Sequence, residues 1–242
     1  AKKRGIIVYE TLFSEFSAPI IEQDSGKKDL IVANNVLNHA NDPESFVRGV
    51  RDLLTDDGVF VYELPYWFNT ISDEKFDQIY HEHVTYFTAK YSYELLKKCG
   101  LEIFNIELVN YHGGSIRVYS RKSNNVKLNS IAKNFIDIET KFGLFEKETY
   151  EKFKNTILEK RNKFLTDLYK LKSEGYTIIA VGAAAKGNTF LNFYNLDKTV
   201  IDYVTDASPH KQGKFTPLTR IPIVSDDIFS KYEDKVCALI FC

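Results

Sequence analysis

Four consecutive residues, Tyr80, His81, Glu82 and His83, place proton-transferring side chains in the otherwise apolar and aromatic stretch FDQIYHEHVTYFT. An imidazole can act as a general base, and a neighbouring carboxylate can orient it and stabilise its charged form. A tyrosine hydroxyl can donate a hydrogen bond to an oxygen that becomes negatively charged. These residue types indicate a site of acid–base catalysis with His83 as the base, Glu82 as its orienting carboxylate and Tyr80 as the hydrogen-bond donor.

The residues alone leave two other interpretations of this stretch open. In one, it is a polar loop whose histidines cap neighbouring backbone groups. In the other, His–Glu–His binds a metal ion, although no further ligands follow at a recognisable spacing. The position favours a site, because the stretch follows a predicted strand that ends at Glu63, and ligands of open parallel sheets bind beyond the carboxyl ends of strands.

The first half of the chain alternates predicted strands and helices. Residues 28–37 form a continuous apolar run, which is typical of a parallel strand covered on both faces. Asp42 is expected to cap a helix that ends at Gly58, and residues 59–65 form the next buried strand. Thr88 is expected to cap a helix that runs through Cys99, and two strands, 101–109 and 113–120, follow it as a hairpin-like pair.

The second half begins after a polar patch at residues 121–130, which we interpret as a linker. A long helical region with apolar residues at helical spacing runs to Gly175. A strand–turn–helix unit at 176–193 and strands at 200–206 and 236–242 then predict a second α/β unit. We therefore expect an α/β protein with two domains, at residues 1–122 and 123–242.

Composition limits the classes of function. Lysine plus arginine (32) nearly balance aspartate plus glutamate (33), so we expect neither a nucleic-acid nor a membrane partner. Three cysteines without CxxC spacing, and no apolar run of about 20 residues, favour a reducing, cytoplasmic setting. The sequence contains no methionine, so we expect that it does not start at an initiator residue.

Five phrases, in this order, resemble the sugar C-methyltransferases of deoxysugar biosynthesis: DLIVANNVLNHANDP, LLTDDGVFVYELPY, FDQIYHEHVTYFT, HGGSIRVYS and VGAAAKGNTFLNF. The resemblance covers nearly the whole chain. It implies a class I, S-adenosylmethionine-dependent methyltransferase sheet followed by a Rossmann-like carboxy-terminal domain. It also implies a substrate that is a nucleotide-linked 4-keto sugar, methylated on a carbon beside the keto group.

The sequence departs from this family at its amino-terminal side. The family's zinc-binding cysteines are absent, so zinc is expected only in an amino-terminal domain that this sequence does not contain. The glycine-rich first turn and the acidic residue that would hold the cofactor's ribose are absent as well. The resemblance therefore implies a fold whose cofactor-binding half is incomplete here.

The resemblance assigns residues to three parts of a site. It points to Tyr80, Glu82 and His83 for catalysis, in agreement with the chemistry of their side chains. Asn34, Asn35, His39 and Glu63 follow strand ends where S-adenosylmethionine would bind. The substrate would be bound by Tyr66, His112, Gly114, Gly182, Lys186, Asn188 and Lys211.

Several of these assignments compete with simpler explanations. Gly114 suits a tight turn as well as close approach to a ligand. The run from Gly182 to Asn188 is a variant of the dinucleotide fingerprint, with Ala184 in place of its middle glycine, and we expect it to bind a pyrophosphate. Lys211 lies in a basic loop that solvation alone would explain.

Two alternative functions remain from the sequence. One is an O-methyltransferase, which needs a base but no enolate stabilisation. The other is a non-catalytic module that binds a sugar nucleotide. The sequence does not predict the sugar, the nucleotide base, the methylated carbon or the oligomeric state.

Overall fold

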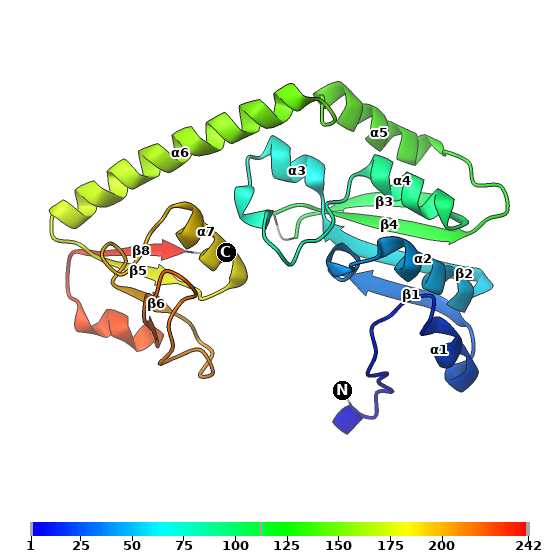
Figure 1. Cartoon of the computed structure of the whole chain (residues 1–242), viewed down its shortest axis with the longest axis horizontal. Helices are drawn as coiled ribbons and strands as arrows, with labels where there is room; N and C mark the ends of the chain where they lie inside the picture. The colour runs from blue at the N-terminus through cyan, green and yellow to red at the C-terminus, as the bar shows by residue number, and fades with distance from the viewer. Residues whose placement is uncertain (1, 112, 241–242) are drawn as a thin grey trace. The chain divides into compact units, whose positions relative to one another are not determined.

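A computed structural model describes residues 2–111 and 113–240, and Figure 1 shows its helices and strands. The chain divides into two compact units, one formed by Ala1–Lys75 and His81–Tyr150 and the other by Phe76–Tyr80 and Glu151–Cys242. The domain boundary predicted between residues 122 and 123 stays a prediction.

The first unit contains a four-stranded sheet in the order β1-β2-β4-β3. β1 (Lys28–Asn34) is parallel to β2 (Leu54–Pro65), and β2, β4 (Ser115–Lys122) and β3 (Leu101–Val109) are antiparallel neighbours. The helices α2 (Pro43–Leu53), α4 (Ala89–Lys98) and α5 (Ser130–Phe142) pack on this sheet around one apolar core. The expected mixed α/β sheet, with its parallel pair followed by an antiparallel pair, is confirmed. The unit also contains η1 (Lys2–Arg4), α1 (Ala18–Ser25), η2 (Leu37–His39) and α3 (Trp67–Ser72).

Two expectations for this unit were wrong. The helix after Asp42 ends at Leu53, and Gly58 lies within β2, where a Cβ atom would stand 2.9 Å from the Lys28 carbonyl oxygen of β1. Gly58 therefore permits close strand pairing and does not end a helix. β1 is an edge strand in the described structure, with Leu30 and Val32 59% and 54% exposed, so it is not covered on both faces.

The second unit has a parallel sheet in the order β7-β6-β5-β8, which confirms the expected Rossmann-like second half. The pattern 176–193 forms β5 (Thr177–Val181) and α7 (Ala185–Phe193), and the long apolar stripe forms α6 (Lys147–Ser173). Leu168 of α6 joins a core made by β5, β6 and α7. The remaining elements are η3 (Phe76–Gln78), β6 (Tyr203–Thr205), β7 (Ile223–Val224), η4 (Asp226–Lys231) and β8 (Val236–Ile240).

Candidate active site

The carboxyl ends of β1 and β2 meet at one edge of the first sheet. Asn34 lies opposite Glu63 in the strand register, and the Asn35 backbone N–H donates to the Glu63 carbonyl oxygen at 2.7 Å. Asn35 then adopts a left-handed conformation (φ 52°), which asparagine tolerates better than most residues. The chain thus turns out of β1 beside Glu63, and three of the predicted cofactor residues share this edge.

The carboxylate of Glu63 is buried and paired. Its Oε2 accepts hydrogen bonds from Nε and Nη2 of Arg117 at 2.9 and 2.7 Å. The hydrogen bond to Glu63 is the main cause that raises the pKa of Arg117. Glu63 is therefore held against β4 by an ion pair, and its predicted contact with the cofactor stays a prediction.

The turn η2 (Leu37–His39) after β1 fixes the main chain around the candidate base. The His39 ring Nδ1 lies 2.6 Å from the Glu82 carbonyl oxygen. Because a carbonyl oxygen can only accept, Nδ1 carries the hydrogen and donates this hydrogen bond. The backbone N–H groups of Val84 and Thr85 donate to the Asn38 carbonyl oxygen at 3.0 and 3.2 Å. These three bonds bracket His83 on both sides and restrict its backbone.

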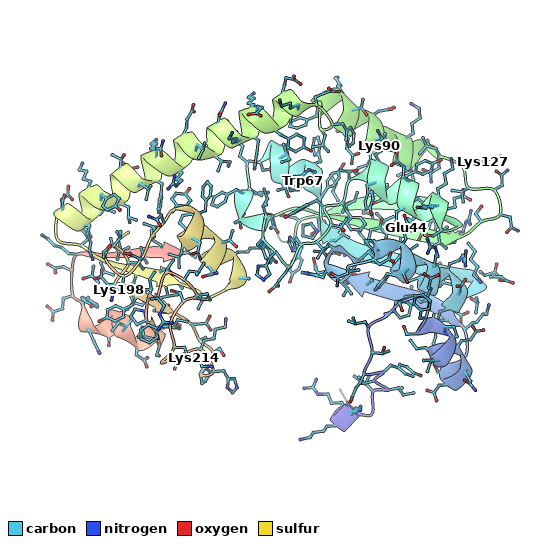
Figure 2. The ribbon with its side chains drawn as sticks, viewed as in Figure 1. Glu44, Trp67, Lys90, Lys127, Lys198 and Lys214 are labelled. Carbon is cyan, nitrogen blue, oxygen red and sulfur yellow. The ribbon has the colours of Figure 1, made fainter. Side chains whose placement is uncertain are left out.

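Aromatic rings enclose the imidazole of His83, which is only 8% exposed. The His39 ring lies 5.2 Å from it and the Tyr86 ring 6.3 Å, both edge to face. Tyr86 in turn lies 4.4 Å from the indole of Trp67, which is labelled in Figure 2. The His83 ring is therefore held by neighbours that leave it few orientations.

For the other two predicted catalytic residues, Glu82 and Tyr80, the structure gives fewer contacts that bear on their predicted roles. Glu82 is exposed, and the hydrogen bond to it from His39 ends on its main-chain oxygen, so a contact between its carboxylate and His83 stays a prediction. Tyr80 is half-buried and belongs to the short segment of the second compact unit.

Two residues beside these loops escaped the sequence-based prediction. Asn38 is 3% exposed, and neither polar atom of its side-chain amide has a hydrogen-bond partner among residues 2–111 and 113–240. Glu139 is fully buried on α5 and accepts hydrogen bonds from the Tyr66 hydroxyl at 2.8 Å and from the backbone N–H of Ala89 and Lys90. Asn38 does carry a local signal, because it stands in the same polar run, NNVLNH, as three predicted cofactor residues. No local pattern marks Glu139, whose partners lie 49 to 73 residues away in sequence.

The predicted substrate residues of the first unit have different surroundings. Tyr66 is 2% exposed, and burial followed by the Glu139 carboxylate raises its pKa far above the usual range, so its hydroxyl stays protonated. Gly114 has φ 113°, and a Cβ atom there would collide with the Asn69 side chain. His112 lies outside the described residues. These roles stay predictions.

In the second unit, the fingerprint-like turn is closed by the protein's own carboxylate. Asp206 accepts hydrogen bonds from the Ala183 N–H at 3.0 Å and from Lys211 Nζ at 2.9 Å. Burial alone would raise the pKa of Asp206, but these bonds and one from the Ser208 N–H outweigh it and lower the pKa. A cavity of only about 40 Å³ remains beside Gly182 and Asn188. Lys186 lies in the first turn of α7 and Lys211 is engaged with Asp206, so pyrophosphate binding at this turn stays a prediction.

The described side chains and helices also bear on metal and membrane binding. Within residues 2–111 and 113–240, no group of three histidine, cysteine, aspartate or glutamate side chains is arranged to hold a metal ion. None of the helices that the structure describes is long and apolar enough to cross a bilayer.

Family models of methyltransferases match both halves of the chain. A model described as "C-methyltransferase C-terminal domain" matches residues 110–241, more than half of the chain, and one described as "Methyltransferase domain" matches residues 7–106. C-methyltransferase NovU of Streptomyces niveus is 29% identical over 231 residues, which cover 94% of this chain and 54% of that protein. The chain thus spans about half the length of this curated relative.

Solved methyltransferase structures resemble a smaller part of the chain. The 1,6-didemethyltoxoflavin-N1-methyltransferase of Burkholderia thailandensis is 18% identical, with a TM-score of 0.31 over 40% of this chain and 44% of that chain. Magnesium protoporphyrin IX methyltransferase of Synechocystis is 13% identical, with a TM-score of 0.32 over 40% of this chain and 46% of that chain. The family models, which match from residue 7 to residue 241 with a short gap, decide the assignment: this chain belongs to the C-methyltransferase family.

Proposed function

We propose that this protein transfers a methyl group from S-adenosylmethionine to a carbon atom of a nucleotide-linked keto-deoxysugar. One observation carries the proposal: the His83 imidazole is buried between the rings of His39 and Tyr86, and hydrogen bonds to η2 hold the main chain on both sides of it. A base in this state suits a reaction that starts with removal of a proton from carbon. Membership of the C-methyltransferase family supports the same chemistry.

Methylation at carbon requires more of the protein than methylation at oxygen. A carbon beside a ketone becomes nucleophilic only when it loses a proton, and the resulting enolate oxygen must be stabilised. We assign proton removal to a ring nitrogen of His83 and donation to the enolate oxygen to the hydroxyl of Tyr80. The carboxylate of Glu82 stabilises the imidazolium that forms when His83 takes the proton.

The residues at the end of β1 fit part of a cofactor site. S-adenosylmethionine, when bound, supplies an electrophilic methyl group to the carbanion. The Asn38 side-chain amide is buried, and no group in the described part of the chain forms a hydrogen bond with it. A buried amide without a partner is costly, so a hydrogen bond from this amide to a polar group of the ligand would be favourable. Asn34 and Asn35 line the same edge, and His39 keeps Nε2 available because Nδ1 donates to Glu82. We infer that these residues hold one side of the cofactor.

The proposal is tested by methyl transfer and by hydrogen exchange with the intact protein. Without methyl donor, the enzyme is expected to exchange deuterium from solvent into the carbon beside the keto group of a nucleotide-linked 4-keto sugar. His83→Asn should lower both rates roughly 100-fold or more, because a positioned base contributes about 10²–10⁴-fold. The matched control His210→Asn, at an exposed position of the second unit, should keep both rates.

Tyr80→Phe separates carbon from oxygen methylation. Loss of the hydroxyl should slow deuterium exchange together with methyl transfer, since both pass through the enolate. Methyl transfer to a hydroxyl group of the sugar, without any exchange at carbon, would contradict the proposal and favour an O-methyltransferase. Binding of a sugar nucleotide without either reaction would favour a non-catalytic module.

A further inference from the structure

Three consecutive aromatic side chains follow β2, and each contacts the same part of the first compact unit. That part is the turn between α5 and α6, which Figure 1 shows where the two helices meet. We call residues 139–150 the α5–α6 elbow; the proposed chemistry uses none of them. The three contacts are a hydrogen bond from the Tyr66 hydroxyl to Glu139 at 2.8 Å, one from Trp67 Nε1 to the Tyr150 hydroxyl at 3.1 Å, and edge-to-face packing of the Phe68 and Phe142 rings at 5.0 Å.

The hydroxyl of Tyr150 is fixed by the elbow itself. Gly143 ends α5 in the left-handed conformation (φ 79°), and the next residue, Leu144, is fully buried. The Tyr150 hydroxyl donates to the Leu144 carbonyl oxygen at 2.8 Å, so its single hydrogen is used and its oxygen accepts from the indole of Trp67. Thr149 Oγ1 donates to the Gly143 carbonyl oxygen at 2.7 Å and closes the same turn. The elbow therefore presents one acceptor at a defined place to the Trp67 indole.

Trp67 connects this acceptor to the segment that carries the candidate base. Its indole lies 4.4 Å from the Tyr86 ring, and its backbone N–H donates to the Phe87 carbonyl oxygen at 3.0 Å. The Tyr86 ring in turn stands edge to face at 6.3 Å from the imidazole of His83. The orientation of a ring that packs on the imidazole therefore depends on where the indole of Trp67 is held.

We propose that Tyr150 is a positioning residue for the proton-removing imidazole: its hydroxyl fixes the Trp67 indole, and through it the Tyr86 ring that packs on His83. The inference rests on the proposed function, because it takes His83 as the base. Proton removal from carbon requires the base at a closely defined distance and angle, and a displacement of about 1 Å can slow a reaction by up to about 100-fold. A hydroxyl that touches neither substrate nor cofactor can in this way control the rate.

Kinetics of the intact protein test the effect on catalysis. Tyr150→Phe keeps the ring of a residue that is 36% exposed and removes only the hydroxyl. It should lower kcat for methyl transfer, and donor-independent deuterium exchange, roughly fivefold, about the effect of one neutral hydrogen bond on an equilibrium. The KM for a nucleotide-linked 4-keto sugar should stay unchanged. The matched control Tyr169→Phe removes a hydroxyl from an exposed position of the same helix and should change neither constant.

A double-mutant cycle tests whether the effect passes through the indole. Trp67→Phe should lower kcat at least as much as Tyr150→Phe, because it removes the hydrogen-bond donor and reduces the stacking on Tyr86. Tyr150→Phe added to Trp67→Phe should lower kcat no further. If the two effects multiplied instead, Tyr150 would act by another route and the proposal would be wrong.

Nuclear magnetic resonance detects the same coupling without turnover. The chain has one tryptophan and five histidines, so the indole N–H signal belongs to Trp67, and the ring signal that disappears in His83→Asn identifies His83. Neighbouring aromatic rings shift such a signal according to their orientation. At constant pH, Tyr150→Phe should shift the Trp67 N–H signal and the His83 ring signal, and Tyr169→Phe should shift neither.

Failure of this inference is distinguishable from failure of the proposed function. An unchanged kcat together with an unchanged His83 signal in Tyr150→Phe would overturn the positioning role while wild-type methyl transfer still supported the function. If the wild-type protein showed neither methyl transfer nor exchange, the proposed function would be wrong. A shifted His83 signal would then still support the coupling from Tyr150 to the imidazole, and an unshifted one would overturn it.

Discussion

At the scale of single residues, the buried carboxylate of Glu139 binds both a tyrosine side chain and the first backbone N–H groups of a helix. It accepts a hydrogen bond from the Tyr66 hydroxyl and from the N–H groups of Ala89 and Lys90 at the start of α4. Burial is the largest influence and raises the pKa of Glu139, although the hydrogen bonds act in the opposite direction. The folded protein therefore holds a proton on Glu139 at pH values where the unfolded chain has released it.

This raised pKa predicts a pH-dependent stability. Between the pKa of an unfolded glutamate, about 4.3, and the raised folded value, the folded state binds more protons than the unfolded state. The contribution of Glu139 to the free energy of unfolding is therefore largest below this window and falls as the pH rises through it. Urea unfolding from pH 4 to 8 should show this decrease in the wild type and a flatter profile in Glu139→Gln.

The control for this prediction is Glu159→Gln, which removes a carboxylate from an exposed position of α6. This variant should keep the wild-type profile. If Glu139→Gln also kept it, the carboxylate would not hold its proton in the folded state.

At the scale of elements, the amino-terminal end of α4 is capped twice. Thr88 Oγ1 accepts from the Tyr91 N–H at 2.9 Å, and Glu139 receives the N–H groups of Ala89 and Lys90. Thr88→Ala should lower the free energy of unfolding by about 0.5–2 kcal/mol, the usual range for loss of a cap, and Thr88→Ser should restore most of it. A cost well below this range in chemical denaturation would show that Glu139 alone suffices to cap the helix.

This helix end also shows what the sequence could predict. The Thr88 cap, the Asp42 cap and the strand–turn–helix unit of β5 and α7 depend on residues within a few positions of one another, and local patterns identified them. The Glu139 contacts and the ring of His39 beside His83 depend on residues that the fold brings together from 43 or more positions apart. The sequence did not predict the edge position of β1 for a related reason. An apolar run indicates a strand, but it does not indicate which strands lie beside it.

At the scale of the whole molecule, each compact unit has its own apolar core. Leu96 is fully buried in the core of the first unit, and Leu191 is 1% exposed in that of the second. Within the part of the chain that the structure describes, neither core cluster contains residues of the other unit's sheet. Domains with separate cores commonly unfold in separate steps, so a single stability value does not describe the chain.

The lone tryptophan allows this expectation to be tested, because Trp67 belongs to the first unit and its fluorescence reports only on that unit. Leu96→Ala should destabilise the first unit by about 2–5 kcal/mol through loss of buried surface and formation of a cavity, and should shift the fluorescence transition to lower urea. Leu191→Ala should leave that transition in place and shift a second one, followed by circular dichroism. If both variants moved both signals together, the two cores would unfold as one cooperative system.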